Sequence, residues 1–333
     1  MSNSSKYEIN QIGMGALQLG ARLCESVRRE MLQGNDPRKL DKDDRSPVTV
    51  ADYGAQALIC RTVSWAFPSS VIVAEEDSLA LREAGHADLL DTITRSVAQQ
   101  VGRVTPAHIL EWIDLGNGVP ADQFWVLDPI DGTKGYLRNE HYAVALAVIE
   151  EGVVTWGGLA CPALTYGQHT GLILTAQCDE GAFLWTLEGD RLDKIQVSDI
   201  AQPKQARMAE SVEAAHTNRG LAGQVKSELD MTMPSVLMDS QTKYAAVACG
   251  LAEIYLRSPN PKTPTYRENL WDHAAGARLV EEAGGTVTDV YGRPLDWQQG
   301  KRLEHNIGIV ATNGQFHDEL ITTMSKFLPP LVS

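Results

Sequence analysis

Apolar residues recur at helical spacing in the first part of the chain. They repeat every four positions along residues 7–33 and form a second stripe along residues 49–67, where Pro68 ends the pattern. Both stripes predict amphipathic helices, because side chains four residues apart lie on one face of a helix. The first stripe consists of Leu19, Leu23, Val27 and Met31.

Short apolar runs predict strands, most of them between residues 120 and 200. The runs lie at residues 71–74, 124–127, 142–150, 153–159, 172–176 and 182–185. Glu150-Glu-Gly separates two of them by a turn that can close a hairpin, and the whole region is typical of a meander of strands. A helical pattern at residues 90–101 precedes it.

After residue 201, helical and strand patterns alternate. We expect helices at residues 218–228, 241–250, 271–283 and 317–327, and strands at 235–238, 252–257, 286–289 and 307–311. Such alternation is typical of an α/β layer. The chain is therefore predicted to have an N-terminal α+β part, residues 1–200, and a C-terminal α/β part, residues 201–333, joined near Pro203.

Composition and charge narrow the classes of protein that fit. The 333 residues carry 43 acidic and 29 basic side chains, a formal charge of −14, and 43% are hydrophobic. These values exclude disordered, collagen-like and coiled-coil chains, and no apolar run approaches the roughly 20 residues of a membrane span. The acidic balance argues against binding to nucleic acid or to anionic membranes. Five cysteines without CxxC spacing, and an N-terminus without a secretory signal, favour a cytoplasmic protein with reduced thiols.

The segment from Trp125 to Thr133 carries the most informative chemistry. An apolar strand runs into Asp128 and Asp131, and the proline and glycine of Asp-Pro-Ile-Asp-Gly predict a turn. Both carboxylates and the Ile130 carbonyl can then converge on one point. Mg²⁺ prefers such an all-oxygen set of ligands, and backbone N–H groups at the following helix start suit a phosphate.

Carboxylates elsewhere in the chain share this placement at element ends. Glu75-Glu76 follows a predicted strand, Asp272 precedes a predicted helix, and Asp52 lies at a helix start. Taken singly, Asp52 and Asp272 are more often cap or turn residues, and Glu75 can belong to a solvated charge run. Together with the Asp128 and Asp131 pair they indicate one acidic site.

Four longer motifs resemble a known family. Trp125–Arg138, and Trp271–Gly276 with Glu282–Gly285, resemble the two signatures of the inositol monophosphatase superfamily of Mg²⁺-dependent, lithium-sensitive phosphatases. Ser46–Gln56 and Asp239–Tyr244 resemble in particular its 3′(2′),5′-bisphosphate nucleotidase branch. The resemblance covers about residues 7–325. It implies the sugar-phosphatase-like fold, a layered α-β-α-β-α sandwich of α+β and α/β parts with the site between them.

The resemblance also implies the metal ligands. Glu75, Asp128 and the Ile130 carbonyl would hold one Mg²⁺, and Asp128, Asp131 and Asp272 would hold a second. His273, beside Asp272, is expected to be structural, because Mg²⁺ prefers oxygen.

Further roles follow from the same motifs. Asp52 and Thr133 would orient and activate the attacking water, with a third, weaker Mg²⁺ near Glu75 and Asp52. Backbone N–H groups of Gly132 and Thr133 would bind the phosphate.

The nucleotide contacts implied by the resemblance lie in the C-terminal part. They are Glu213, His216, Ser240, Lys243 and Arg257. Departures from the family pattern are expected to lie on the nucleotide side of the site and not beside the metals. They are Tyr136 for phenylalanine, Ala214 for glycine, Thr217 for serine, Asn269 for lysine, and a longer, proline-rich segment at residues 258–265.

The activity implied is removal of the 3′-phosphate from adenosine 3′,5′-bisphosphate, giving AMP and phosphate, in a monomer that belongs to sulfur assimilation. The sulfated analogue, 3′-phosphoadenylyl sulfate, is a second expected substrate. A related phosphatase acting on an inositol phosphate or another small phosphorylated metabolite remains an alternative, as does a non-catalytic protein that keeps the fold. Lys243, Arg257 and His216 favour the nucleotide, because a sugar monophosphate has no need of them.

Overall fold

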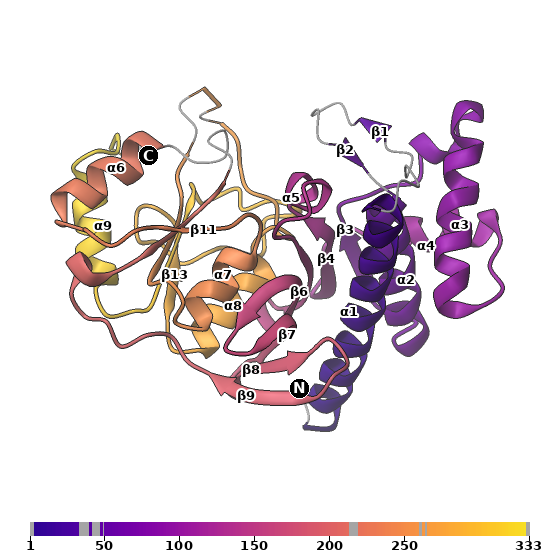
Figure 1. Ribbon diagram of the computed structural model, residues 1–333, viewed down its shortest axis with the longest axis horizontal. Helices are drawn as coiled ribbons and strands as arrows, with labels where there is room; N and C mark the ends of the chain where they lie inside the picture. The colour runs from indigo at the N-terminus through magenta and orange to yellow at the C-terminus, as the bar shows by residue number, and fades with distance from the viewer. Residues whose placement is uncertain are drawn as a thin grey trace.

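The computed structural model describes residues 3–32, 40–41, 47–48, 50–212, 219–259, 262–263 and 265–330. Within these residues, helices and sheets stack in five alternating layers (Figure 1). The three helical layers are α1 (Asn3–Leu32) with α2 (Val50–Ala66), α7 (Thr242–Ala248) with α8 (Ala274–Glu282), and α6 (Arg219–Glu228) with α9 (His317–Ser325). The predicted α-β-α-β-α sandwich is thereby confirmed.

The first sheet has seven strands in the order β3-β4-β5-β6-β7-β8-β9. Its strands are β3 (Val71–Ala74), β4 (Gln123–Asp131), β5 (Ala143–Glu150), β6 (Val153–Tyr166), β7 (His169–Gln177), β8 (Gly181–Thr186) and β9 (Arg191–Ile195). β3 and β4 run parallel, and every later neighbour is antiparallel, so the predicted meander and its hairpin at Glu150 are confirmed. The sequence analysis missed β9, a largely exposed edge strand whose charged residues hide the apolar alternation.

The second sheet has five strands in the order β11-β10-β12-β14-β13. They are β10 (Met208–Glu210), β11 (Val236–Leu237), β12 (Ile254–Arg257), β13 (Thr286–Thr288) and β14 (Ile309–Thr312). The sequence analysis missed β10, which is only three residues long.

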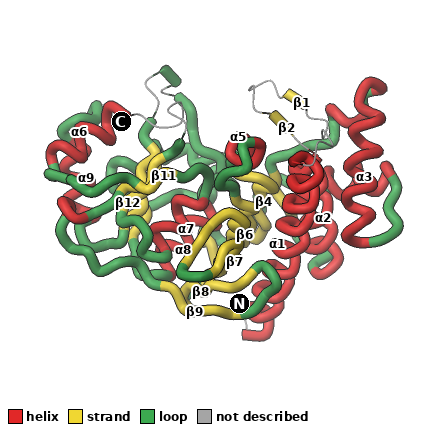
Figure 2. The backbone as a smooth tube through the Cα atoms, viewed as in Figure 1, coloured by secondary structure: helices red, strands yellow, loops and turns green. Residues whose placement is uncertain are grey.

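The remaining elements are short or peripheral. Helices α3 (Ala87–Val101) and α4 (Pro106–Asp114) lie with α1 and α2 on one side of the first sheet, and Figure 2 shows α1, α2 and α3 gathered there. α5 (Thr133–Leu137) follows β4. The small elements are the β1 (Leu40–Asp41) and β2 (Pro47–Val48) pair and the 3₁₀ turns η1 (Ala80–Arg82), η2 (Ala84–His86) and η3 (Pro203–Gln205).

Alternation along the strands separates the hydrophobic clusters on the two faces of the first sheet. On β4, Phe124 and Val126 join the cluster with α7 and α8, whereas Trp125 and Leu127 join the cluster with α1 and α2. This is the period of two that a strand buried on both faces requires. Because β4 is fixed from both sides, the acidic segment at its end is held rigidly.

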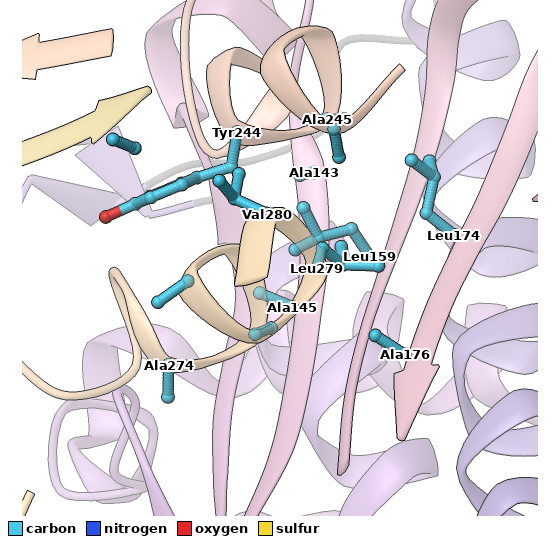
Figure 3. Packing of buried hydrophobic residues seen from close by; sticks show 14 of the residues in the cluster. Ala143, Ala145, Leu159, Leu174, Ala176, Tyr244, Ala245, Ala274, Leu279 and Val280 are labelled. Atoms are coloured by element: carbon cyan, nitrogen blue, oxygen red, sulfur yellow. The ribbon is translucent and has the colours of Figure 1, made fainter. Parts of the chain in front are cut away.

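The central helical layer joins the two parts of the chain. Figure 3 shows side chains of α7 and α8 packed against those of the first sheet. Gly276 of α8 permits close packing against α7, because a Cβ there would lie 2.3 Å from the Tyr244 ring. The predicted boundary at residue 200 falls in a loop, yet the largest hydrophobic cluster spans both sides of it.

The structure also bears on the state of the cysteines and on membrane-spanning helices. All five cysteines are free thiols, as predicted, and four of them are buried. No helix in the described ranges has the length and apolarity needed to cross a membrane.

Candidate active site

One pocket brings together most of the residues singled out from the sequence. Those that line it are Glu75, Asp128, Ile130, Asp131, Gly132, Thr133, Ser240, Lys243, Arg257 and Asp272. Asp52, in the first turn of α2, is 2% exposed and close enough to Asp128 to raise that residue's pKa. Glu213 and His216 lie outside the described residues.

The predicted turn between Asp128 and Asp131 is wrong in form, because β4 continues through both residues. Asp128 pairs with Ala145 of β5 and Asp131 with Ala143, so the two strands lose register between these pairs. This is a β-bulge, which re-aims side chains without ending the strand. The Ile130 N–H donates to Asp128 Oδ1 at 3.1 Å and fixes that carboxylate within the bulge.

The electrostatics of the pocket are dominated by buried carboxylates. Burial raises the pKa of Asp128 well above its usual range, and repulsion from four other carboxylates adds to the effect. The four are Glu75, Asp131, Asp272 and Asp52. Burial, with repulsion from Asp131, raises the pKa of Asp272 to about 8. Burial also raises the pKa of Asp131, although Lys243 opposes it.

These residues fit a divalent cation. Carboxylates buried together cost free energy unless positive charge enters the cluster. The donor set consists of carboxylate oxygens and the Ile130 carbonyl, which suits Mg²⁺ and not a metal that prefers nitrogen or sulfur.

A second acidic group lies beside the first and has a different character. Glu268, Asp272 and His273 bring one potential ligand atom each within 4.8 Å of one another. Glu268, however, already accepts from Arg257 Nε at 2.7 Å and lies 3.2 Å from His273 Nε2. Burial alone raises the pKa of Glu268, but Arg257 and His273 outweigh it and hold that pKa at about 2. Glu268 is therefore the anion of an ion-pair network, and His273 is structural.

The start of α5 lies directly after the bulge, as predicted. Gly132 precedes the helix with φ +89°, a conformation that glycine adopts without strain. A Cβ on Gly132 would also lie 2.9 Å from the Ser240 Cβ. Thr133 Oγ1 donates to the Ile130 carbonyl at 3.2 Å, so the hydroxyl is held against a candidate metal ligand.

Ser240 lies just before α7 in a left-handed backbone conformation. The helix begins at Thr242, one residue later than predicted, and Ser240 has φ +67°. Its hydroxyl accepts from the Thr242 N–H at 3.1 Å. The Gln241 N–H donates to Asp131 Oδ2 at 2.5 Å. The left-handed residue thus turns the next amide toward the acidic cluster, and such backbone strain gathers at functional sites.

Three basic side chains line the pocket: Lys134 of α5, and Lys243 and Arg257 from later in the chain. Lys243 is 5% exposed, with Nζ 3.3 Å from Ser211 Oγ and 5.2 Å from the centre of the Tyr255 ring. Burial lowers the pKa of Lys243 to about 8. Arg257 ends β12, and its pKa stays well above the usual value because Glu268 outweighs the effect of burial.

The structure corrects the expected positions of Asn269 and Tyr136, two of the residues that depart from the family pattern. Asn269 lies beside a predicted metal ligand and not away from the metals, because its Nδ2 donates to Asp272 Oδ2 at 3.1 Å. Tyr136 lies outside the pocket lining and is fully buried, with its hydroxyl donating to the Cys24 carbonyl of α1 at 2.9 Å. That bond ties α5 to α1.

Other pocket residues were not found from the sequence. They are Ser211, Asp239, Tyr255 and Tyr266. Asp239 accepts from Arg138 at 2.6 Å and so joins the segment after α5 to the loop after β11. Its place next to Ser240 was the one available signal.

Comparisons with known proteins find similarity over nearly the whole chain. Residues 8–327 match the model of the inositol monophosphatase family. A protein of Oryza sativa named 3′(2′),5′-bisphosphate nucleotidase is 42% identical over 329 residues, covering 92% of this chain and 90% of the relative. A protein of the same name from Schizosaccharomyces pombe is 36% identical over 337 residues, covering 93% of each.

Solved structures agree on the fold. The Thermotoga maritima IMPase has a TM-score of 0.64 at 22% identity and covers 95% of this chain and 96% of that one. The extragenic suppressor protein suhB of Bartonella henselae has a TM-score of 0.67 at 19% identity, covering 96% and 99%. At these identities the likeness concerns the fold alone.

Proposed function

Because the chain belongs to the inositol monophosphatase family, we propose that it is a Mg²⁺-dependent phosphatase that removes the 3′-phosphate of adenosine 3′,5′-bisphosphate. The products are AMP and inorganic phosphate. One observation carries the proposal: a cluster of buried carboxylates shares a pocket with Lys243 and Arg257. The first set suits metal-assisted hydrolysis, and the second suits another phosphate on the same substrate.

Two metal positions are proposed. Glu75, Asp128 and the Ile130 carbonyl would hold one Mg²⁺, and Asp128, Asp131 and Asp272 the other. When bound, such ions supply positive charge for the attacking and leaving oxygens and lower the pKa of water. A third, weaker position would involve Glu75 and Asp52.

The residues of the chain would position the reactants. Thr133 donates its hydroxyl hydrogen to the Ile130 carbonyl, so its oxygen is oriented to accept a hydrogen bond from the attacking water. Asp52 would orient the same water and take its proton. The water oxygen bonds to phosphorus as the bond to the ribose O3′ breaks. O3′ takes a proton from bulk water, and the proton held by Asp52 returns to the solvent. Backbone N–H groups of Gly132 and Thr133 would hold the phosphate oxygens.

Recognition of the nucleotide would come from the C-terminal part. The whole chain carries −14, so a doubly phosphorylated substrate needs local positive charge at short range. Lys243, Arg257 and Ser240 would provide contacts to the 5′-phosphate and ribose, together with Glu213 and His216.

Finer features of the proposal follow from the family resemblance. We propose hydrolysis of 3′-phosphoadenylyl sulfate, inhibition by lithium, and a place in sulfur assimilation. We also propose a cytoplasmic monomer that binds no nucleic acid, built of the two parts 1–200 and 201–333.

The test compares substrates and metal. Phosphate release is measured from adenosine 3′,5′-bisphosphate and from inositol 1-phosphate, each with Mg²⁺ and with excess chelator. We expect Mg²⁺-dependent release that strongly prefers the nucleotide. Preference for inositol 1-phosphate would favour the alternative phosphatase, and full turnover in chelator would refute the metal-dependent mechanism.

A further inference from the structure

Arg257 is held by a buried carboxylate that the proposed chemistry does not use. Its Nε donates to Glu268 Oε2 at 2.7 Å, and the Glu268 side chain is 9% exposed while that of Arg257 keeps 28%. Arg257 lines the pocket. The guanidinium is therefore held by the hydrogen bond to Glu268 and remains accessible from the pocket.

Glu268 is itself fixed by a chain of buried hydrogen bonds. The Glu268 oxygen that accepts from Arg257 also lies 3.2 Å from His273 Nε2, and His273 Nδ1 lies 2.9 Å from the Tyr244 hydroxyl. A carboxylate can only accept, so His273 donates through Nε2, and Nδ1 accepts from Tyr244. His273 is 1% exposed and Tyr244 is fully buried.

Tyr244 anchors this chain of contacts in the molecular core. Its ring packs in the central hydrophobic cluster, and Figure 3 shows its hydroxyl pointing away from the labelled aliphatic residues. Tyr244 follows Lys243 in α7, and His273 follows Asp272. The network is thus one residue removed from a second pocket cation and from a predicted metal ligand.

We propose that Glu268 is a positioning residue, which fixes the Arg257 guanidinium for the substrate's 5′-phosphate through the network Arg257–Glu268–His273–Tyr244. The inference rests on the proposed function, since it needs a substrate with a second phosphate. Arginine is a long side chain, and holding it in its binding geometry before the ligand arrives reduces the entropy lost on binding.

The charge of Glu268 makes the direction of the change in KM a test of the proposal. A carboxylate beside Arg257 lowers the positive potential of the pocket, so by charge alone Glu268 weakens phosphate binding. If Glu268 acted only through its charge, Glu268→Gln would lower the KM for the bisphosphate. If it acts by fixing Arg257, the same variant raises that KM.

The experiment measures kcat and KM on two substrates. For Glu268→Gln we expect the KM for adenosine 3′,5′-bisphosphate to rise about tenfold, the scale of one charge-assisted hydrogen bond. The kcat, and the KM for adenosine 3′-monophosphate, stay unchanged. A KM for the bisphosphate that falls or stays constant overturns the proposal, as does an equal change for both substrates.

The matched control is Glu253→Gln. Glu253 is also buried, at 0% exposure, and pairs with Arg207 at 2.8 Å, but it lies outside the pocket lining. The Glu253→Gln variant also loses an ion pair of a buried glutamate with an arginine, so any general loss of stability caused by such a change appears in this variant too. We expect neither KM to change.

A double-mutant cycle tests whether Glu268 acts through Arg257. In the Arg257→Ala background, Glu268→Gln should add no further rise in KM for the bisphosphate. An additive effect overturns the proposal. The proposal is also overturned if the unmutated enzyme is active and Arg257→Ala leaves the KM for the bisphosphate unchanged. If the unmutated enzyme releases no 3′-phosphate, the proposed function itself is refuted.

A second variant covers the case in which Glu268→Gln fails to fold. Glu268→Asp keeps the buried charge and withdraws the carboxylate by one methylene. We expect the same rise in KM for the bisphosphate alone, and unchanged kinetics on both substrates would overturn the proposal.

Discussion

Lys243 offers a specific test of how the second phosphate is recognised. Replacement by methionine removes the ammonium and keeps a side chain of similar length, which preserves packing over the Tyr255 ring. The expected effect is a weaker hold on the 5′-phosphate with the 3′-phosphate chemistry intact.

The magnitude follows from the burial of the charge. Lys243 is 5% exposed, and its Nζ lies 3.3 Å from the neutral Ser211 hydroxyl, a long contact that a phosphate oxygen can replace. A hydrogen bond to a charged group contributes about 1.5–3 kcal/mol. Its loss should therefore raise the KM for adenosine 3′,5′-bisphosphate roughly ten- to a hundredfold.

The assay compares two enzymes on two substrates. For Lys243→Met, adenosine 3′-monophosphate should react with nearly unchanged kcat and KM, because it lacks the phosphate that Lys243 contacts. If both substrates lose equally, Lys243 supports the fold or the metal ligands instead. If neither loses, the nucleotide contacts proposed here are wrong.

The pKa of Lys243 adds a pH dependence. Burial lowers that pKa to about 8, so the free enzyme carries the charge below pH 8 and loses it above. The KM for the bisphosphate should therefore rise, and kcat/KM should fall, as the pH passes about 8. The pH dependence of kcat/KM reports this change, because it follows the ionisation of groups in the free enzyme. Lys243→Met lacks the group and should not show this rise. An identical pH profile for both enzymes would contradict the reasoning.

Three further predictions address the metals and the phosphate loop. Asp128→Asn should lower kcat by several orders of magnitude, and Mg²⁺ should raise the Tm of the parent in a thermal melt but not that of the variant; an equal rise in both would exclude Asp128 as a ligand. Lithium should inhibit phosphate release at concentrations below that of Mg²⁺, and unchanged activity in excess lithium would count against the family mechanism. Gly132→Ala should raise the KM and cost about 1–2 kcal/mol of stability in denaturant unfolding, because φ is +89° and the new Cβ would lie 2.9 Å from Ser240; a variant as stable and active as the parent would refute the strain argument.

The sequence predicted the elements whose periodicity is strong. The stripes of α1 and α2 and the apolar runs of β3 to β8 fall where the pattern placed them, because each buries one or two complete faces. It missed β9 and β10, which are short or exposed, and α4, whose nine residues begin at Pro106 with a Thr105 capping box that was not recognised.

The pocket shows a similar division. The Asp128 motif could be identified from the sequence, because a turn or a strand rarely needs two carboxylates on either side of an apolar residue. The bulge that aims them depends on pairing with β5, which no local pattern encodes. Glu268 was invisible for the same reason, since its importance comes from Arg257, eleven positions earlier, and from His273. Glu213 and His216 stay predictions.

Identification of the reaction product tests the central claim most directly. Adenosine 3′,5′-bisphosphate is incubated with the enzyme and Mg²⁺, and the nucleotide product is separated and identified. We expect adenosine 5′-monophosphate with one equivalent of phosphate, and no product when a chelator removes the metal. Adenosine 3′-monophosphate as the product, or no hydrolysis of the bisphosphate under these conditions, would contradict it.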